Sequence, residues 1–407
     1  FENANAITTG VVFKDAGVTV QANYKGHMLS NNASASGSNG QRKLMRDQYG
    51  IYHLVYTSMN TLWYTKSTTT NFGGTWTQEV DLIQYGDAGE IKNPSIDITG
   101  DEIIVVYEAR WLNDYTIDYM KWDVSSSTPG SSNEEIASID GNYFGQAYPV
   151  VAYTYSELFS SKEIFIVYRP TNSGGLKYAR RYYIDNELNE EELNMLLPGT
   201  DFQSKTPSVA GSKNSQKIFI VYEQAGNSIK HIETDYYQGR DFEEFETIST
   251  GSGYKYNFSP SISLYGESRG FRPIVSWTVT DNTVSKQNEN ETKNIRKICI
   301  RPSSAQTVWG SYWLVGDNVS ISQNNSSNNT SSETVIGWTQ NSGSENRWVK
   351  RVGGYYTAAQ CIDPAGGGLM ISNGSSLNTI KALTLTTASL PYTFNKSPQN
   401  FYSPVAC

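Results

Sequence analysis

The sequence predicts an all-β fold that is built from one repeated, strand-rich unit. Its 407 residues include 28 Tyr, 14 Phe, 9 Trp and 34 Gly. Aromatic residues favour strands, whereas Gly, Ser and Asn favour the turns between them. A helix is predicted only at residues 186–197, and it is short. So many aromatic residues also exclude a disordered chain and indicate a large ordered core.

The net charge of −8 argues against nucleic-acid binding, since phosphate backbones are bound by basic surfaces. No apolar run approaches the roughly 20 residues that cross a bilayer, so we expect no membrane-spanning helix. There is no signal peptide, and the start at Phe1 is typical of a processed protein.

The three cysteines, Cys299, Cys361 and Cys407, lie far apart and lack the spacing of metal ligands. At most one disulfide can therefore form within the chain. Sparse cysteine fits a bacterial exported protein or a cytosolic one. The abundance of Asn, Ser, Thr and Tyr, with few Lys, favours the exported protein, so we expect an extracellular or cell-surface location.

The clearest copy of the repeated unit runs over residues 48–82. A strand at residues 51–56 is followed by a polar turn at 58–60 and a second strand at 62–67. A structured hairpin at residues 69–76 then leads into a final strand that ends near Leu82. This order predicts an antiparallel sheet of short strands joined by tight turns.

A common phrase identifies the later copies. It is a strand that begins with Pro-Ser-Ile or a similar triplet, then a loop, then an apolar strand that ends in Val-Tyr or its Trp equivalent. The triplets begin at Pro94, Pro149, Pro207 and Pro260, and a looser copy begins at Val319. Including the first unit, the terminal aromatic residues are 51 to 61 residues apart, at Tyr56, Tyr107, Tyr168, Tyr222, Trp277 and Trp338.

A unit of about four short strands cannot bury both faces of its sheet alone, but stacking against neighbours around a ring buries them. We therefore predict a β-propeller over residues 41–395, after an N-terminal segment 1–40 and before a tail 396–407. Seven blades are favoured. The seventh would use strands at 369–372 and 380–386, and a strand at 18–23 would close the ring. Six blades and a pair of β-sandwiches are the alternatives.

The hairpin of the first unit carries a recognisable motif. Thr69, Asn71, Gly73, Thr75 and Trp76 match the Asp-box, Ser/Thr-x-Asp-x-Gly-x-Thr-Trp, with Asn in place of Asp. The short polar side chain can bond to the loop's own amides, Gly permits positive φ, and Trp plugs the sheet interface. With the repeat, the chain resembles the sialidase-like (BNR/Asp-box) propeller superfamily. It also resembles secreted surface propellers of Bacteroidota.

The resemblance implies the fold more strongly than the activity. Sialidases use an arginine cluster on the substrate carboxylate, a Tyr/Glu nucleophile pair and an Asp acid/base, and their first arginine lies in an Arg-Ile-Pro motif. This chain has Arg169-Pro170, Arg272-Pro273 and Arg301-Pro302, but no Arg-Ile-Pro.

Residues just after the Val-Tyr phrase should gather on one face of a propeller, because the second strands of all blades end there. Mixed charges and aromatic rings on that face could hold a sugar or a peptide. The opposite face should carry the Asp-box hairpin. The ligand-binding candidates are Glu108, Arg110, Trp111, Arg169, Glu223 and Gln224.

Plainer interpretations remain open. These charged residues could be ordinary solvated strand ends, and His53 is better explained by packing than by ligation. We expect no metal and no cofactor: turns such as Asp281-Asn282 could bind calcium, but they lack a ligand spacing. The leading function is a non-catalytic glycan- or protein-binding module. The alternatives are a glycoside hydrolase of sialidase-like fold and a structural module of an exported or envelope assembly.

Overall fold

The computed structural model describes about three fifths of the chain, in separate segments. The described residues are 42–69, 76–85, 89–130, 133–171, 174–212, 216–224, 228–234, 241–249, 255–267, 270–281, 293–300, 313–317, 325–326, 334–340, 345–352, 355–356, 360–361, 371–372 and 379–380. Over these segments no helix has the length and apolar character needed to cross a membrane.

The strands form antiparallel sheets in chain order. The first sheet contains β1 (Leu44–Arg46), β2 (Tyr52–Ser58), β3 (Thr61–Lys66) and β4 (Val80–Gln84). The second contains β5 (Gly89–Thr99), β6 (Glu102–Trp111), β7 (Asp114–Asp123) and β8 (Asn133–Ser138). The third contains β9 (Val150–Ser156), β10 (Ser161–Tyr168), β11 (Lys177–Ile184) and β12 (Glu187–Leu196).

The later sheets continue the same order. The fourth contains β13 (Lys205–Gly211), β14 (Ile218–Gln224), β15 (Ser228–Thr234) and β16 (Phe242–Ser249). The fifth contains β17 (Lys255–Glu267), β18 (Gly270–Asp281), β19 (Lys293–Ile300) and β20 (Trp313–Asp317). The sixth contains β21 (Asn325–Ser326), β22 (Thr334–Gln340), β23 (Glu345–Val352), β24 (Tyr355–Tyr356) and β25 (Gln360–Cys361), and a separate pair joins β26 (Ile371–Ser372) to β27 (Thr379–Ile380).

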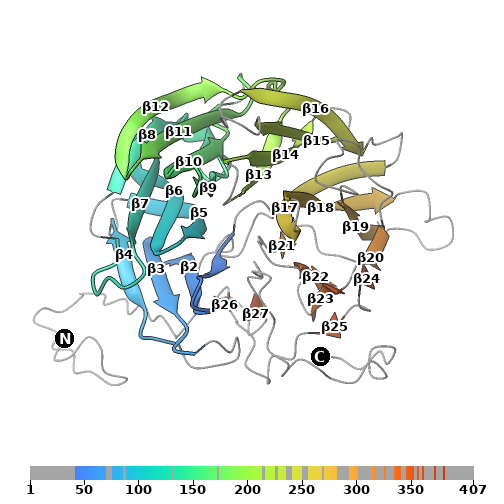
Figure 1. The fold of residues 1–407 in the computed structure, drawn as a ribbon, viewed down its shortest axis with the longest axis horizontal. Coiled ribbons are helices and arrows are strands. Elements are labelled where there is room, and N and C mark those ends of the chain that lie inside the picture. The colour runs from blue at the N-terminus through green and yellow to red at the C-terminus, as the bar shows by residue number, and fades with distance from the viewer. Residues whose placement is uncertain are drawn as a thin grey trace, which may run out of the picture.

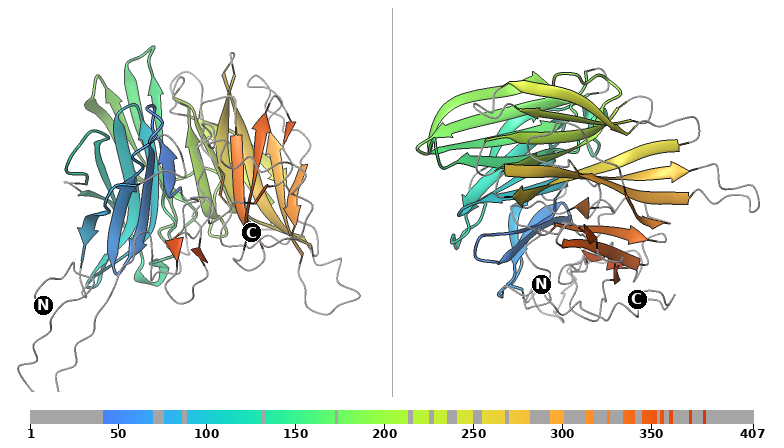
Figure 2. Two further views of the ribbon diagram at one scale, coloured as in Figure 1. Left: turned by 90° about the horizontal axis from the view of Figure 1, so that it is seen from below. Right: turned by 45° about the vertical axis from the view of Figure 1, so that its right-hand side comes forward.

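The sheets are arranged around a common axis, like the blades of a propeller (Figure 1). The first strand of each sheet lies innermost, and β5 contacts β1 and β9, β13 contacts β9 and β17, and β17 contacts β21. Figure 2 shows the same sheets from the side, with their strands running between two faces of the molecule. This is not the arrangement of two β-sandwiches. The predicted closing strand at residues 18–23 lies outside the described residues, so the blade number and the closure remain predictions.

The hydrophobic core lies between neighbouring sheets. Val55 and Leu62 of the first sheet pack with Ile96 and Val105 of the second. The same layering is repeated between the second and third, third and fourth, and fourth and fifth sheets. Burying a large apolar side chain contributes about 1.5–3 kcal/mol. The terminal aromatic residues of the repeated phrase are accordingly fully or almost fully buried at Tyr56, Tyr107, Tyr168, Tyr222 and Trp277.

The prediction of a helix at residues 186–197 is wrong, because this segment forms the outer strand β12. Asp185 and Asn186 have φ of 51° and 66°, as a tight hairpin turn requires, and direct the chain back along β11. Across the pair, Arg181 Nε lies 2.5 Å from Glu191 Oε1. Strand pairing and these charge contacts override the helix propensity of Glu and Leu.

A buried arginine joins three sheets at the axis. Nη2 of Arg42 donates hydrogen bonds to the carbonyl oxygens of Val151, at 3.1 Å, and of Val209. Nη1 lies 3.4 Å from Oδ1 of Asp97, which is also buried. Because these partners lie on β9, β13 and β5, one side chain connects the inner strands of three consecutive sheets.

The innermost strands also approach one another closely. A Cβ atom built on Gly211 would lie 2.1 Å from the carbonyl oxygen of Tyr153. Only glycine allows β13 to lie this close to β9.

Candidate ligand-binding face

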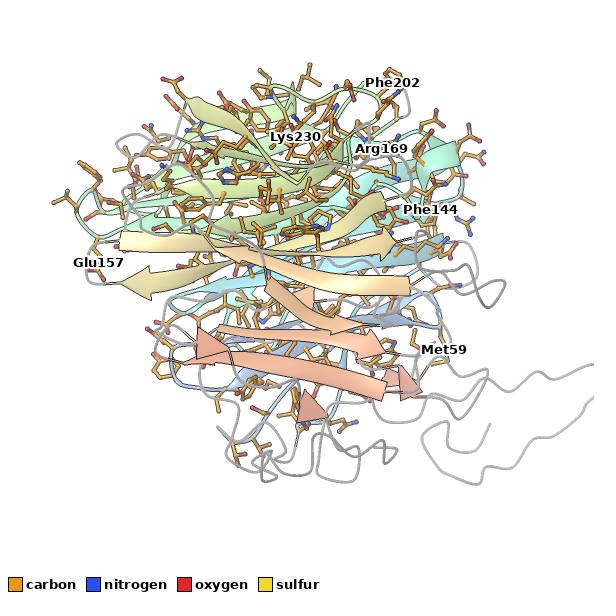
Figure 3. All side chains as sticks on the ribbon, turned by 90° about the vertical axis from the view of Figure 1, so that its right-hand side faces the viewer. Met59, Phe144, Glu157, Arg169, Phe202 and Lys230 are labelled. Carbon is orange, nitrogen blue, oxygen red and sulfur yellow. The ribbon has the colours of Figure 1, made fainter. Side chains whose placement is uncertain are left out.

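The strands run between two opposite faces of the molecule, which can be told apart by the side chains labelled in Figure 3. Met59, Phe144, Arg169 and Phe202 lie on one face, and Glu157 lies on the opposite one. We call the first the Arg169 face. The second strands β6, β10 and β14 end there, and the first strands β5, β9 and β13 begin there, as the antiparallel pairings require.

An unusual backbone conformation recurs where the inner strands begin. The residues before the three prolines, Asn93, Tyr148 and Thr206, have φ of 51°, 45° and 46°. Non-glycine residues seldom adopt positive φ, and such conformations concentrate at functional sites. In β5 and β13 the residue lies in a bulge that shifts the strand register. The repeated Pro phrase therefore marks a bulged strand start that brings a side chain to this face.

Glu108 lies beneath the surface and anchors a connection between sheets. Its Oε1 accepts hydrogen bonds from Asn93 Nδ2 at 2.6 Å and from the Tyr148 N–H at 2.9 Å, while Oε2 accepts one from the Gly145 N–H. Burial raises the pKa of Glu108, and the three hydrogen bonds oppose that shift. The sequence predicted that Glu108 would line an open pocket, but the side chain is fully buried and its oxygens bind the protein's own donors.

A buried lysine, Lys43, interacts electrostatically with Glu108. Lys43 is fully enclosed, and its Nζ donates a hydrogen bond to the carbonyl oxygen of Pro94. Burial lowers the pKa of Lys43 to about 7, although the negative charge of Glu108 acts in the opposite direction. Beneath the Arg169 face, two ionisable side chains of the protein, Glu108 and Lys43, are therefore fully buried.

Glu223 and Gln224 are both held by residues at the start of β13 or directly before it. Glu223 is 5% exposed, lies 3.3 Å from Lys205 Nζ and accepts a hydrogen bond from the Thr206 hydroxyl. Ser204 donates a hydrogen bond of 2.6 Å to Gln224 Oε1. These contacts orient both side chains at the start of β13.

Tyr148 is influenced by the charges of predicted site residues from the second, third and fourth sheets. Burial raises the pKa of its hydroxyl, the charges of Glu108 and Glu223 raise it further, and Arg169 opposes them. Tyr148 therefore lies within electrostatic reach of three of the predicted site residues. Tyr148 is not among the site residues predicted from the sequence, although its place before Pro149 was an available signal.

The Arg169 side chain contacts both the segment that leads into β9 and the segment that leads into β13. Its guanidinium carbon lies 5.5 Å from the ring centroid of Tyr143, and Nη2 donates a hydrogen bond of 3.0 Å to the carbonyl oxygen of Phe202. The backbone N–H of Arg169 donates a hydrogen bond to the carbonyl oxygen of Ala147. Tyr143 belongs to the short 3₁₀ helix Gly141–Tyr143 that precedes β9, and Phe202 precedes β13.

Arg110 and Trp111 lie at the end of β6 beside a second aromatic group. Arg110 Nη2 and Lys92 Nζ lie 3.4 Å and 3.1 Å from the Glu90 carboxylate. Lys92 also lies 4.6 Å, and Arg110 5.7 Å, from the Phe144 ring centroid. Trp111 is 46% exposed, and its ring centroid lies 5.6 Å from that of Tyr85.

The predicted Asp-box hairpin lies at the other end of the first sheet. Ser67 forms an isolated bridge with Trp76, next to the end of β3 that lies opposite Met59. Trp76 is half-buried, so it does not plug the interface as completely as the motif implied. Thr69 is exposed, and Asn71, Gly73 and Thr75 lie outside the described residues.

Four further residues near this site were not predicted from the sequence: Lys92, Tyr143, Phe144 and Phe202. Three of the four lie on connections between sheets, for which the repeated phrase gave no signal. Across the described segments, no group of three His, Cys, Asp or Glu side chains could hold a metal ion. His53 is packed, with hydrogen-bond distances of 2.7 Å to Tyr64 and 3.1 Å to Asp47.

No family model matches the sequence, and no curated protein matches it. Several solved structures are similar in fold. A mutant Aleuria aurantia lectin in complex with Fucα1-6GlcNAc has a TM-score of 0.45 at 9% identity, over 86% of this chain and 99% of its own. A fungal lectin from Aleuria aurantia, described as a six-bladed β-propeller, has a TM-score of 0.44 at 10% identity, over 82% of this chain and 95% of the lectin. The polysaccharide lyase Uly1 has a TM-score of 0.43 at 10% identity, over 84% of this chain and 85% of the lyase. TM-scores and identities this low carry neither a ligand nor an activity to this chain.

Proposed function

We propose that this chain is a carbohydrate-binding protein that holds a glycan on the Arg169 face without cleaving it. The finer parts of the proposal are a seven-bladed propeller closed by residues 18–23, membership of the sialidase-like (BNR/Asp-box) superfamily, and an extracellular or cell-surface location. The motif at residues 69–76 supports the superfamily, and the abundance of Asn, Ser, Thr and Tyr with few Lys supports export.

One observation carries the binding function: accessible aromatic rings on the Arg169 face lie beside oriented polar groups. Trp111 and Phe202 are 46% and 56% exposed. Arg110 and Arg169 lie next to Phe144 and Tyr143. Sugars present apolar C–H faces that pack on aromatic rings, and hydroxyl groups that bond to charged side chains. Side chains of both kinds, held in place by neighbours, are suited to a glycan.

The two predicted carboxylates, Glu108 and Glu223, support hydrolysis less well than the aromatic and polar side chains support glycan binding. Glycosidases need two carboxyl groups about 5–10 Å apart that can reach the scissile bond. Glu108 is enclosed by Asn93, Gly145 and Tyr148, and Glu223 is paired with Lys205. Turnover of fluorogenic glycosides that is lost in Glu223→Gln, with folding intact, would establish the hydrolase instead.

The proposal is tested by glycan-array binding of the whole chain. We expect binding that falls in Phe202→Ala and persists in Phe159→Ala, a matched control because Phe159 is 51% exposed in the turn that follows Glu157 on the opposite face. If no glycan binds while a protein partner is captured through the same face, the ligand is a protein. Recovery of the native chain only in a stable complex would favour a structural module.

A further inference from the structure

Aromatic residues recur on the Arg169 face in three consecutive connections between sheets. Tyr85 follows β4, Tyr143 and Phe144 follow β8, and Phe202 follows β12. Each connection leads from the outermost strand of one sheet to the innermost strand of the next. Aromatic side chains are therefore placed at successive positions around the axis rather than in a single cluster.

Contacts link these aromatic residues into a continuous arc. Tyr85 packs against Trp111, at 5.6 Å between ring centroids. The neighbouring Arg110 lies over Phe144, at 5.7 Å from its ring centroid. Arg169 continues the series, because it contacts Tyr143 on one side and the carbonyl oxygen of Phe202 on the other. We call this series, from Tyr85 to Phe202, the aromatic arc.

The arc is held in place by the structure beneath it. A Cβ atom on Gly89 would lie 2.2 Å from Cβ of Tyr85, so the glycine lets Tyr85 lie against the start of β5. Glu108 fixes the connection that carries Phe144. The most exposed rings of the arc are Trp111, which packs against Tyr85 at one end, and Phe202 at the other end. A preorganised surface of this kind costs a ligand little ordering free energy.

Charged side chains along the arc lie against carboxylates of the protein. Lys92 and Arg110 share the carboxylate of Glu90, and Lys205 pairs with Glu223. The whole chain carries a net charge of −8, which repels a polyanion at long range. Both observations favour an uncharged ligand.

We propose that the aromatic arc binds a linear, uncharged polysaccharide that lies across the second and third sheets, from Trp111 to Phe202. This inference rests on the proposed carbohydrate-binding function and names its ligand class. Successive sugar units of one chain stack on successive rings, and the arginines between the rings donate hydrogen bonds to the hydroxyl groups. A single terminal sugar would use only one part of the arc.

The test compares neutral soluble polysaccharides, namely β-glucan, mannan and xylan, with their oligomers from one sugar upwards, by calorimetry on the whole chain. We expect affinity to rise with oligomer length until the chain spans the arc. Trp111→Ala and Phe202→Ala should each weaken binding of long oligomers about tenfold, which is about 1.4 kcal/mol. The double variant should lose the length dependence, and Phe159→Ala should bind like the unmodified protein.

Four outcomes are decisive. Equal affinity for a single sugar and for long oligomers would overturn the extended site while leaving glycan binding intact. Unchanged binding in both Trp111→Ala and Phe202→Ala would overturn the assignment to the arc. Preference for a uronic-acid polymer with steep salt dependence would overturn the uncharged ligand. Absence of binding to every glycan would refute the proposed function itself.

Discussion

The carboxylate of Glu108 accepts a hydrogen bond of 2.9 Å from the backbone N–H of Tyr148, 40 residues further along the chain. The bond connects β6 of the second sheet to the residue that precedes β9 of the third. It holds a tyrosine with positive φ in place, and with it the connection that carries Tyr143 and Phe144.

Glu108→Gln should destabilise the protein by about 1–3 kcal/mol, because the new amide N–H₂ group would face donors where a carboxylate oxygen now accepts. Urea unfolding would measure the loss, and hydrogen exchange should quicken at the Gly145 and Tyr148 amides. Glu157→Gln, at an exposed site on the opposite face, is the matched control. Equal stability of the two variants would contradict the anchoring role.

Arg42→Met should destabilise the protein strongly, by about 3–5 kcal/mol, because it leaves the buried carboxylate of Asp97 without its cation. The double variant Arg42→Met/Asp97→Asn should lose less than the sum of the two single losses. A double-mutant cycle of unfolding free energies measures this coupling. Additive losses would show that the ion pair contributes nothing.

Lys43 should make stability depend on pH between about 7 and 10.5. In this window the unfolded chain keeps the lysine proton, whereas the folded protein has released it. The free energy of unfolding should therefore rise with pH through the window, by at most about 1.4 kcal/mol for each pH unit. Below about pH 7, Lys43 is protonated in both the folded and the unfolded protein, so it does not make the free energy of unfolding depend on pH.

The variant Lys43→Met is compared with the unmodified protein, since the substitution removes the titrating group and retains an unbranched side chain. The difference in unfolding free energy between the two proteins should change with pH over the window and stay constant below it. A difference that is constant from pH 7 to pH 10 would show that Lys43 does not titrate there.

Trp76→Ala should cost about 1–2 kcal/mol, less than a fully buried tryptophan would, because this side chain is only half-buried. Glycan affinity of the folded protein should not change, since the Ser67–Trp76 bridge lies at the end of the first sheet opposite Met59. Trp111→Ala should show the reverse pattern, with weakened binding and little loss of stability. Thermal unfolding and calorimetry on the two variants separate these effects.

The repeated phrase was sufficient to predict the first two strands of the second to fifth sheets. Pro94 and Tyr107 mark β5 and β6, and the same spacing located the pairs β9–β10, β13–β14 and β17–β18. Periodicity succeeds here because each copy buries the same aromatic position between sheets. Residues 186–197 were mispredicted because an outer strand exposes both faces and so lacks an apolar alternation.

The candidate site could be predicted only in part. The positions after the phrase led to Arg110, Trp111 and Arg169, which do lie on one face. Burial could not be inferred for Glu108, because its partners Gly145 and Tyr148 are distant in sequence. Phe202 could not be found for a related reason: nothing local marks a connection that crosses to the next sheet.

The position of Arg42 restricts the order in which the protein can fold. Its carbonyl partners on β9 and β13 follow it by 109 and 167 residues, so the first sheet leaves the ribosome long before they are synthesised. Until then its guanidinium group must stay hydrated or find other partners, because a buried charge without a partner is unfavourable. The high sequence separation of these contacts predicts slow, late consolidation of the inner strands. We therefore expect the first, second, third and fourth sheets to reach their final stability together, once both carbonyl partners of Arg42 are in place.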